Sequence, residues 1–300
     1  MTYILFAVLA LFSSVGNTIF NRISSHKIGS VLSAVIKSLM ITVACFIICV
    51  CFGHIKVLYS LSKTDWMWIG ILGAITLVDW LFYFLALKRA HLEAFAPFEV
   101  STILFVSNLL FSIFMMGTVM NTINALNIVL FYGGLLVLLA SMLYAVLNKK
   151  INPITKISWV IYSVISATAL AFTFLVVKTK LTHIPSDVIA FHQMLIVFIA
   201  SSIMLIFSKD KFEIKTIPWK TYLNFFISAV FNALLMVFRY MALASANANP
   251  SLINIIVCLD FVFVSIATVL FFKADNKKQL VILIILVVVG MILNALPAIL

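Results

Sequence analysis

Six ionisable residues lie inside long apolar stretches of this 300-residue sequence. If those stretches cross a bilayer, each charge at its centre costs about 2.5–3.5 kcal/mol on insertion scales, and such groups typically mark solute, ion or proton pathways. The alternative is a static pair that only fixes helix packing. The six candidates for gating or proton coupling are Lys37, Asp79, Glu99, His192, Arg239 and Asp260.

Polar and aromatic neighbours of these residues indicate the solute. Carboxylates among aromatic rings suit an ammonium group, through charge and cation–π attraction. A guanidinium suits a carboxylate, which it can contact with two parallel hydrogen bonds. Together they favour an amino acid, or a related zwitterion or organic cation. The predicted substrate-binding residues are Asp79, Trp80, Tyr83, Glu99, Asn232, Arg239, Tyr240, Asn254 and Asp260.

The composition places these residues in lipid. Hydrophobic residues make up 65% of the chain and charged residues 10%, against about 45–50% and 25% in soluble domains. The net charge of +11 comes from basic residues between the apolar runs, which indicates membrane topology rather than a nucleic-acid partner. The four cysteines lie within apolar runs without metal-ligand spacing, so we expect neither a cofactor nor a metal site.

The apolar runs have the length of membrane-spanning helices, about 20 residues each. Helices are expected rather than strands because each run is long and continuous. The sequence therefore predicts an all-α membrane protein of ten transmembrane helices. Their approximate bounds are Thr2–Asn21, Ser30–Gly53, Asp65–Leu87, Glu93–Gly117, Asn124–Leu147, Ile157–Val177, Ser186–Phe207, Trp219–Leu243, Pro250–Phe272 and Gln279–Ala298.

Basic residues are divided unequally between the two sides. Lys37 and Arg239 fall within spans; of the other 18 Lys and Arg residues, only four lie in the loops after even-numbered spans. The loops after odd-numbered spans hold the other 14 and should face the cytoplasm. This count predicts a multi-pass protein of the cell membrane with both termini outside. The four residues on the poor side are Lys56, Lys63, Lys178 and Lys180.

The sequence also matches itself at a constant offset of 156 residues. Ala86, Leu87 and Ala90 align with residues 242, 243 and 246, and Gly134 aligns with Gly290. Each half holds five spans. Because five is odd, the second half starts on the opposite side of the membrane and is inverted relative to the first. Residues 1–148 and 149–300 are thus expected to form two inverted five-helix repeats within one membrane domain. Such repeats are typical of secondary transporters, with the substrate at their interface.

The Ala-Leu pair that closes the third span of each half is followed by a short turn and then a helix with a proline. The segments are residues 86–97, ending at Pro97, and residues 242–250, ending at Pro250. This pattern resembles the EamA-like branch of the drug/metabolite transporter superfamily over essentially the whole chain. The resemblance implies a ten-span transporter whose cavity is lined by spans 1, 3, 4, 6, 8 and 9. It also implies cytoplasmic termini, which conflicts with the charge count, so both orientations stay open.

The depths of the charges suggest a mechanism. Lys37, Asp79 and Glu99 should lie roughly 13–15 Å from one face at 1.5 Å per residue, and His192, Arg239 and Asp260 near the other. Two gates would follow, with Lys37 paired to Asp79 or Glu99 in one and Arg239 paired to Asp260 in the other. A carboxylate in a low-dielectric cavity also takes up a proton more readily than one in water, so Asp79 or Glu99 would couple transport to H⁺.

Other readings remain for this chain. The same fold would suit a flippase that moves an amphiphilic lipid-linked substrate. A membrane-embedded enzyme fits less well, because the sequence lacks a His-Glu-x-x-His motif and a Gly-rich phosphate loop. We therefore expect a non-enzymatic transporter, a monomer or homodimer. Its expected partners are a small-molecule substrate and the lipid bilayer, with H⁺ as the candidate coupling ion.

Overall fold

The computed structural model describes residues 2–25, 28–90, 92–120, 122–149, 157–210, 217–271 and 277–300. Within these ranges, only the backbone is described for residues 22–25, 92–94 and 266–271. Part of the charge count and one end of a predicted span fall outside the described residues. These positions are Lys27, Lys150, Lys156, Lys211, Lys215, Lys273 and Phe272.

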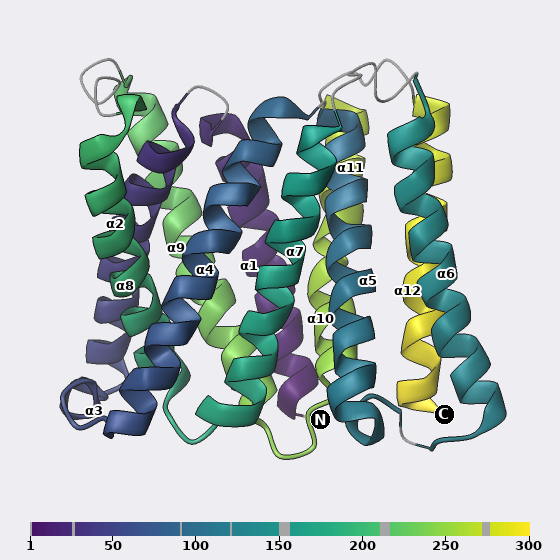
Figure 1. Cartoon of the computed structure of the whole chain (residues 1–300), viewed down its shortest axis with the longest axis horizontal. Coiled ribbons are helices and arrows are strands. Elements are labelled where there is room, and N and C mark those ends of the chain that lie inside the picture. Colours follow the sequence, from purple (N-terminus) through teal and green to yellow (C-terminus); the bar gives the residue numbers. More distant parts are fainter. Residues whose placement is uncertain are drawn as a thin grey trace.

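The described chain is a bundle of long helices with both termini at the same end (Figure 1). Nine helical stretches in it are long and apolar enough to cross a membrane. We call the end that holds the termini the termini face and the opposite end the loop face. The elements are α1 Thr2–Ser25, α2 Ser30–Cys51, α3 Ile55–Leu58, α4 Lys63–Arg89, α5 Leu92–Val119, α6 Ala125–Leu147, α7 Ser158–Val176, the π-helical turn η1 Val177–Leu181, α8 Ser186–Phe207, α9 Trp219–Ala244, α10 Pro250–Cys258, α11 Asp260–Phe271 and α12 Lys277–Ile299.

The ninth predicted span is interrupted, which its apolar pattern did not indicate. Helix α10 ends at Cys258 and α11 begins at Asp260, with Leu259 in a turn between them. The Leu259 amide bonds the Ile256 carbonyl at 3.2 Å, a three-residue spacing tighter than that of an α-helix. No glycine or proline marks the break, which coincides with the one acidic residue in this stretch.

The packing follows the inverted repeat. Helix α1 of the first half packs against α9 of the second, and the equivalent helices α7 and α4 pack in the same way. Helix α2 meets its own counterpart α8, and α6 meets α12. The chain is thus an all-α membrane protein of two inverted five-helix repeats that interleave in one bundle.

Helices α6 and α12 stand together at one side of the bundle (Figure 1). Gly134 and Gly290, equivalent positions of the two repeats, let them approach closely. A β-carbon on Gly134 would lie 2.0 Å from Asn294 Nδ2, and one on Gly290 would lie 2.8 Å from Leu138 Cγ. Small residues at a contact are the usual means of close helix packing in lipid.

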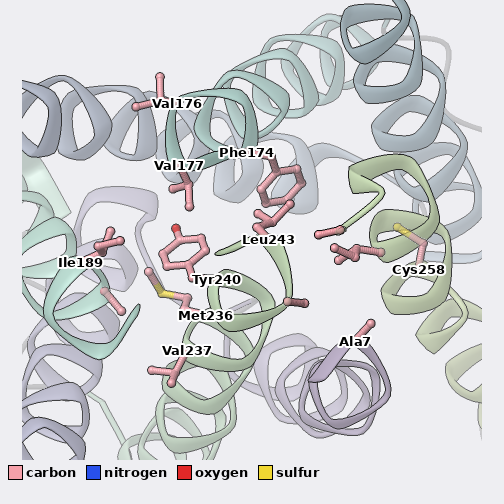
Figure 2. Close-up of a cluster of buried hydrophobic side chains, with 14 of the residues drawn as sticks. Ala7, Phe174, Val176, Val177, Ile189, Met236, Val237, Tyr240, Leu243 and Cys258 are labelled. Carbon is pink, nitrogen blue, oxygen red and sulfur yellow. The ribbon is translucent and has the colours of Figure 1, made fainter. Parts of the chain in front are cut away.

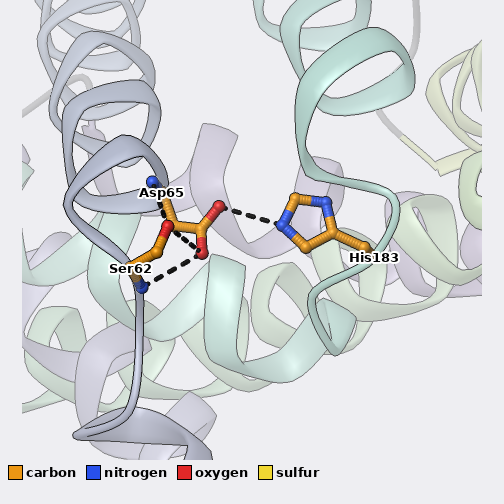
Figure 3. Close-up of polar contacts among 3 residues, drawn as sticks. All are labelled: Ser62, Asp65 and His183. Carbon is orange, nitrogen blue, oxygen red and sulfur yellow. Dashed lines mark hydrogen bonds and ion pairs between the residues drawn. The ribbon is translucent and has the colours of Figure 1, made fainter.

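Two His–Asp ion pairs lie toward the termini face. His54, just after α2, lies 2.9 Å from Asp187 in the first turn of α8. His183, in the loop before α8, lies 2.9 Å from Asp65 in the first turn of α4 (Figure 3). Asp65 also completes a capping box with Ser62 at the start of α4. These contacts hold the ends of α2, α4 and α8 together.

Candidate functional site

A central cavity lies among the helices and encloses about 1240 Å³ of empty space, including the part open to solvent. Its walls come from α1, α4 and α5 of the first repeat and from α7, α9, α10 and α11 of the second. Since α10 and α11 together form the ninth span, these helices are the six spans that the family resemblance implied. Lys37 of α2 and Gln193 of α8 also reach it, whereas α6 and α12 contribute no lining residue.

Most of the predicted site residues lie around this cavity. Asn254 instead lines a smaller crevice beside it. His192 lies outside both, with Nε2 bonded to the Leu58 carbonyl at 3.1 Å and its ring 4.6 Å from that of Trp66. The His192 side chain therefore does not contact the cavity, so the structure offers no support for its predicted role in gating or proton coupling. The predicted residues that line the cavity are Lys37, Asp79, Trp80, Tyr83, Glu99, Asn232, Arg239, Tyr240 and Asp260.

The two cations of the cavity each lie over an aromatic ring. The Lys37 ammonium is 5.6 Å from the centre of the Trp80 ring and donates to Asn17 Oδ1 at 2.9 Å. The Arg239 guanidinium is 4.5 Å from the centre of the Phe174 ring. Both contacts are close enough for cation–π attraction. Lys37 thus has a hydrogen-bond acceptor from α1, while Arg239 rests on an aromatic face.

The carboxylates accept hydrogen bonds from hydroxyls of other helices. Ser166 of α7 donates to Asp79 Oδ1 at 2.6 Å. Ser14 and Thr18 of α1 donate to Asp260 Oδ2, at 2.5 and 3.2 Å. Asp260 is also the first residue of α11, where the helix dipole favours a negative charge. The interrupted span therefore places a stabilised carboxylate in the cavity wall.

The expected gate pairs are not in contact in this conformation. Within the described part of the chain, neither Lys37 nor Arg239 lies within ion-pair distance of a carboxylate. The five charges that reach the cavity line one continuous space. The reason is geometric: depth along a helix sets the level of a residue, but open space separates side chains on opposite walls. Arg239, Asp79 and Asp260 line the same cavity without an ion-pair contact between Arg239 and either carboxylate.

A hydrogen-bonded chain in the wall escaped the sequence reasoning. Tyr240 donates to Gln193 Oε1 at 2.7 Å, and Gln193 Nε2 donates to Thr76 at 2.6 Å. The chain links α9, α8 and α4, so it crosses between the two repeats. The internal repeat could have pointed to Gln193 as a cavity residue, because Gln193 lies 156 residues after Lys37 and occupies the equivalent position.

Among the described residues, the lining combines three acidic residues, Asp79, Glu99 and Asp260, with two basic ones, Lys37 and Arg239. A charge that stays uncompensated in a low-dielectric site is costly. The described lining thus offers a solute groups of both signs of charge. Among the described residues, no cluster of His, Cys, Asp and Glu has the geometry of a metal site.

Comparisons with known proteins agree with this architecture. The EamA-like transporter family matches residues 1–140 and again residues 157–296, two ranges displaced by 156 residues. No curated protein matches the sequence. A solved structure titled only "Crystal structure of protein" superposes with a TM-score of 0.65 at 19% identity, over 97% of this chain and 96% of that one. That similarity supports the fold, and the two family matches identify the chain as a member of the EamA-like transporter family, a multi-span membrane transporter.

Proposed function

We propose that the protein is a secondary transporter that carries a small zwitterion, an amino acid or a close relative, across the cell membrane by alternating access. The observation that carries the proposal is the cavity lining, in which Arg239 lies without an ion-pair partner in the described chain while three carboxylates stand on other walls. A solute with separated positive and negative groups would complement both.

Arg239 is the proposed contact for the substrate carboxylate. Its guanidinium has one face against Phe174, and its edge remains able to donate two parallel hydrogen bonds to a carboxylate. Lys37 is a weaker candidate for this contact because Asn17 and the Trp80 ring already hold its ammonium.

The carboxylates are the proposed contact for the substrate ammonium. The rings of Trp80 and Phe174 already face the protein's own cations, so attraction to these aromatics does not suffice for a second cation. Asp79 keeps acceptor capacity beyond the hydrogen bond from Ser166, because a carboxylate offers about four lone-pair sites, and Glu99 and Asp260 line the same cavity. We therefore assign the ammonium to the carboxylates rather than to an aromatic cage.

Coupling to protons forms part of the proposal. Asp79 is buried, and a single hydroxyl, that of Ser166, donates to its side chain in the described chain. A proton on Asp79 or Glu99 would neutralise that carboxylate when the substrate ammonium leaves. We keep the orientation that the basic loops favour, with the loop face in the cytoplasm and the termini outside.

Binding to the purified protein tests this function. A thermal-shift screen against amino acids, quaternary ammonium compounds and nucleosides should give hits among the amino acids. Arg239→Gln and Glu99→Gln should each abolish the shift, while Asp65→Asn, far from the cavity at the start of α4, should leave it intact. A shift that survives both cavity substitutions would refute the proposed site.

A further inference from the structure

A narrow crevice lies beyond Arg239 on the side of the termini face. It contains about 160 Å³ of empty space and is too narrow in this conformation to hold a solute. Phe174 and Arg239 line both this crevice and the central cavity, so the two spaces are neighbours separated by these side chains. The residues around the crevice are Phe174, Arg239, Leu243, Pro250, Ile253 and Asn254.

Two hydrogen-bond donors in the wall of this crevice have no acceptor. Arg239 Nε and Asn254 Nδ2 are both buried, and neither has a partner in the described part of the structure. Asn254 as a whole is 2% exposed. Buried donors are nearly always satisfied in native proteins, and exceptions tend to have a functional reason. Two such donors on one crevice call for an acceptor that the described residues do not supply, and a carboxylate is the strongest one available to a transported solute.

Apolar side chains close the crevice. Figure 2 shows Phe174, Leu243 and Tyr240 crowded between the ends of α7 and α9, with Met236 and Val177 beside them. These five residues are nearly or fully buried. The Phe174 ring covers one face of the Arg239 guanidinium, so a movement of Arg239 would uncover that ring and the crevice behind it.

The backbone next to this closure is irregular. Helix α7 ends in the π-helical turn η1, a rare conformation that often marks functional sites. Lys178 on that turn donates to the carbonyls of Leu243, at 2.8 Å, and Ser245, at 3.3 Å, at the end of α9. These bonds tie α7 to α9, and they are few enough to be exchanged when the two helix ends separate.

We infer that the crevice is the closed form of the substrate's passage to the termini face, and that a substrate carboxylate opens it by bonding to Arg239 and then Asn254. The carboxylate draws Arg239 off the Phe174 ring, and the two unsatisfied donors become the second site through which the solute passes. The passage itself follows from the crevice and its closure; its trigger rests on the zwitterion proposed above.

Thiol labelling tests the passage without any substrate. In a variant that lacks the four native cysteines, Ile253→Cys reports on the crevice wall. A membrane-impermeant methanethiosulfonate should react slowly from the termini side, and adding Phe174→Ala should raise that rate at least tenfold. The control is Phe131→Ala, which removes an equally buried ring from α6, away from the cavity. An unchanged rate with Phe174→Ala, or an equal rise with Phe131→Ala, would overturn the passage.

The same reporter tests the trigger. Amino acids should accelerate labelling of Ile253→Cys several-fold, their primary amides should not, and Asn254→Leu should abolish the acceleration. If amino acids shift the melting temperature but leave the labelling rate unchanged, the substrate carboxylate does not open the crevice, while the proposed function still stands. An absence of any amino-acid binding, with Phe174→Ala still opening the crevice, would refute the zwitterion and the trigger and support the passage.

Asn254→Leu also separates a functional role from a structural one. Because it removes an unsatisfied donor, it should leave the melting temperature unchanged or higher. Asn249→Leu at the N-cap of the same helix is the matched control and should lower the melting temperature, because Asn249 accepts from the Leu252 amide and donates to the Val119 carbonyl. Equal losses of stability in the two variants would mean that Asn254 is a packing residue.

Discussion

Tyr83 on the side of the loop face and Arg239 on the side of the termini face lie 156 residues apart and occupy equivalent positions of the two repeats. The Tyr83 side chain is a neutral phenol, and its oxygen accepts a hydrogen bond from Asn21 of α1 at 3.1 Å. Arg239 meets Phe174 of the equivalent helix α7 and keeps an unsatisfied donor in the described structure. The scaffold is symmetric, but its chemistry is not. A neutral hydrogen bond can open and close without a solute, whereas a charge that lacks an acceptor responds to one.

The largest effect is expected from Arg239→Gln. It removes a charge that the equivalent position Tyr83 lacks, so amino-acid uptake into proteoliposomes should fall at least a hundredfold, which corresponds to about 2.7 kcal/mol or more. Tyr83→Phe, at the equivalent position, serves as the paired variant and should retain most of the uptake. Similar losses in both would erase the proposed difference between the ends.

Asp79→Asn should uncouple transport from protons. Uptake driven by a pH gradient should drop by about tenfold or more, because the amide cannot exchange a proton. Exchange of labelled for unlabelled substrate should persist, since that assay needs no net proton movement. If gradient-driven uptake survives at the wild-type rate, Asp79 is not the coupling group.

Gly134→Ala should weaken the scaffold without altering either end. Its β-carbon would meet the Asn294 side chain at 2.0 Å, and overpacking of this kind costs about 1–3 kcal/mol. Gly133→Ala is the matched control, because nothing lies within 4 Å of its β-carbon. Thermal unfolding in detergent should show a lower melting temperature for the first variant only. Equal stability would mean that α6 and α12 pack less tightly than described.

Tyr83→Phe itself should have a small effect. It removes the phenol that accepts from Asn21, a hydrogen bond worth about 1 kcal/mol. The closed state at the loop face should be destabilised by that amount, seen as a several-fold faster labelling of Thr18→Cys from that side. No change in labelling would indicate that other contacts hold this end.

His183→Ala should have the smallest effect. The imidazole of His183 is 61% exposed where it meets Asp65 (Figure 3), and surface ion pairs contribute about 0–1 kcal/mol. Melting temperature and uptake should stay close to those of the wild type. A large loss of uptake would mean that this pair, rather than Arg239 and Phe174, controls the termini face.

The sequence predicted the spans because apolar length decides whether a helix crosses lipid. Five helices begin at the expected residue: Thr2, Ser30, Ser186, Trp219 and Pro250. It also placed Lys37, Asp79 and Arg239 at buried depths, and they line the cavity. It did not predict their partners, because spacing along one helix gives no rotation relative to its neighbours. The break at Leu259 was missed for a related reason: its apolar pattern is continuous, and the contacts that accompany it come from Ser14 and Thr18 of another helix.

Binding of a matched set of three ligands tests the central proposal most directly. Calorimetry on the purified protein should compare an amino acid identified in the thermal-shift screen with its primary amide and its deaminated acid. The amino acid should bind, while removal of either charged group should weaken binding at least tenfold, with the carboxylate preference lost in Arg239→Gln. Equal affinity for the amino acid and its amide in the wild-type protein would contradict the assignment of Arg239 and with it the proposed site.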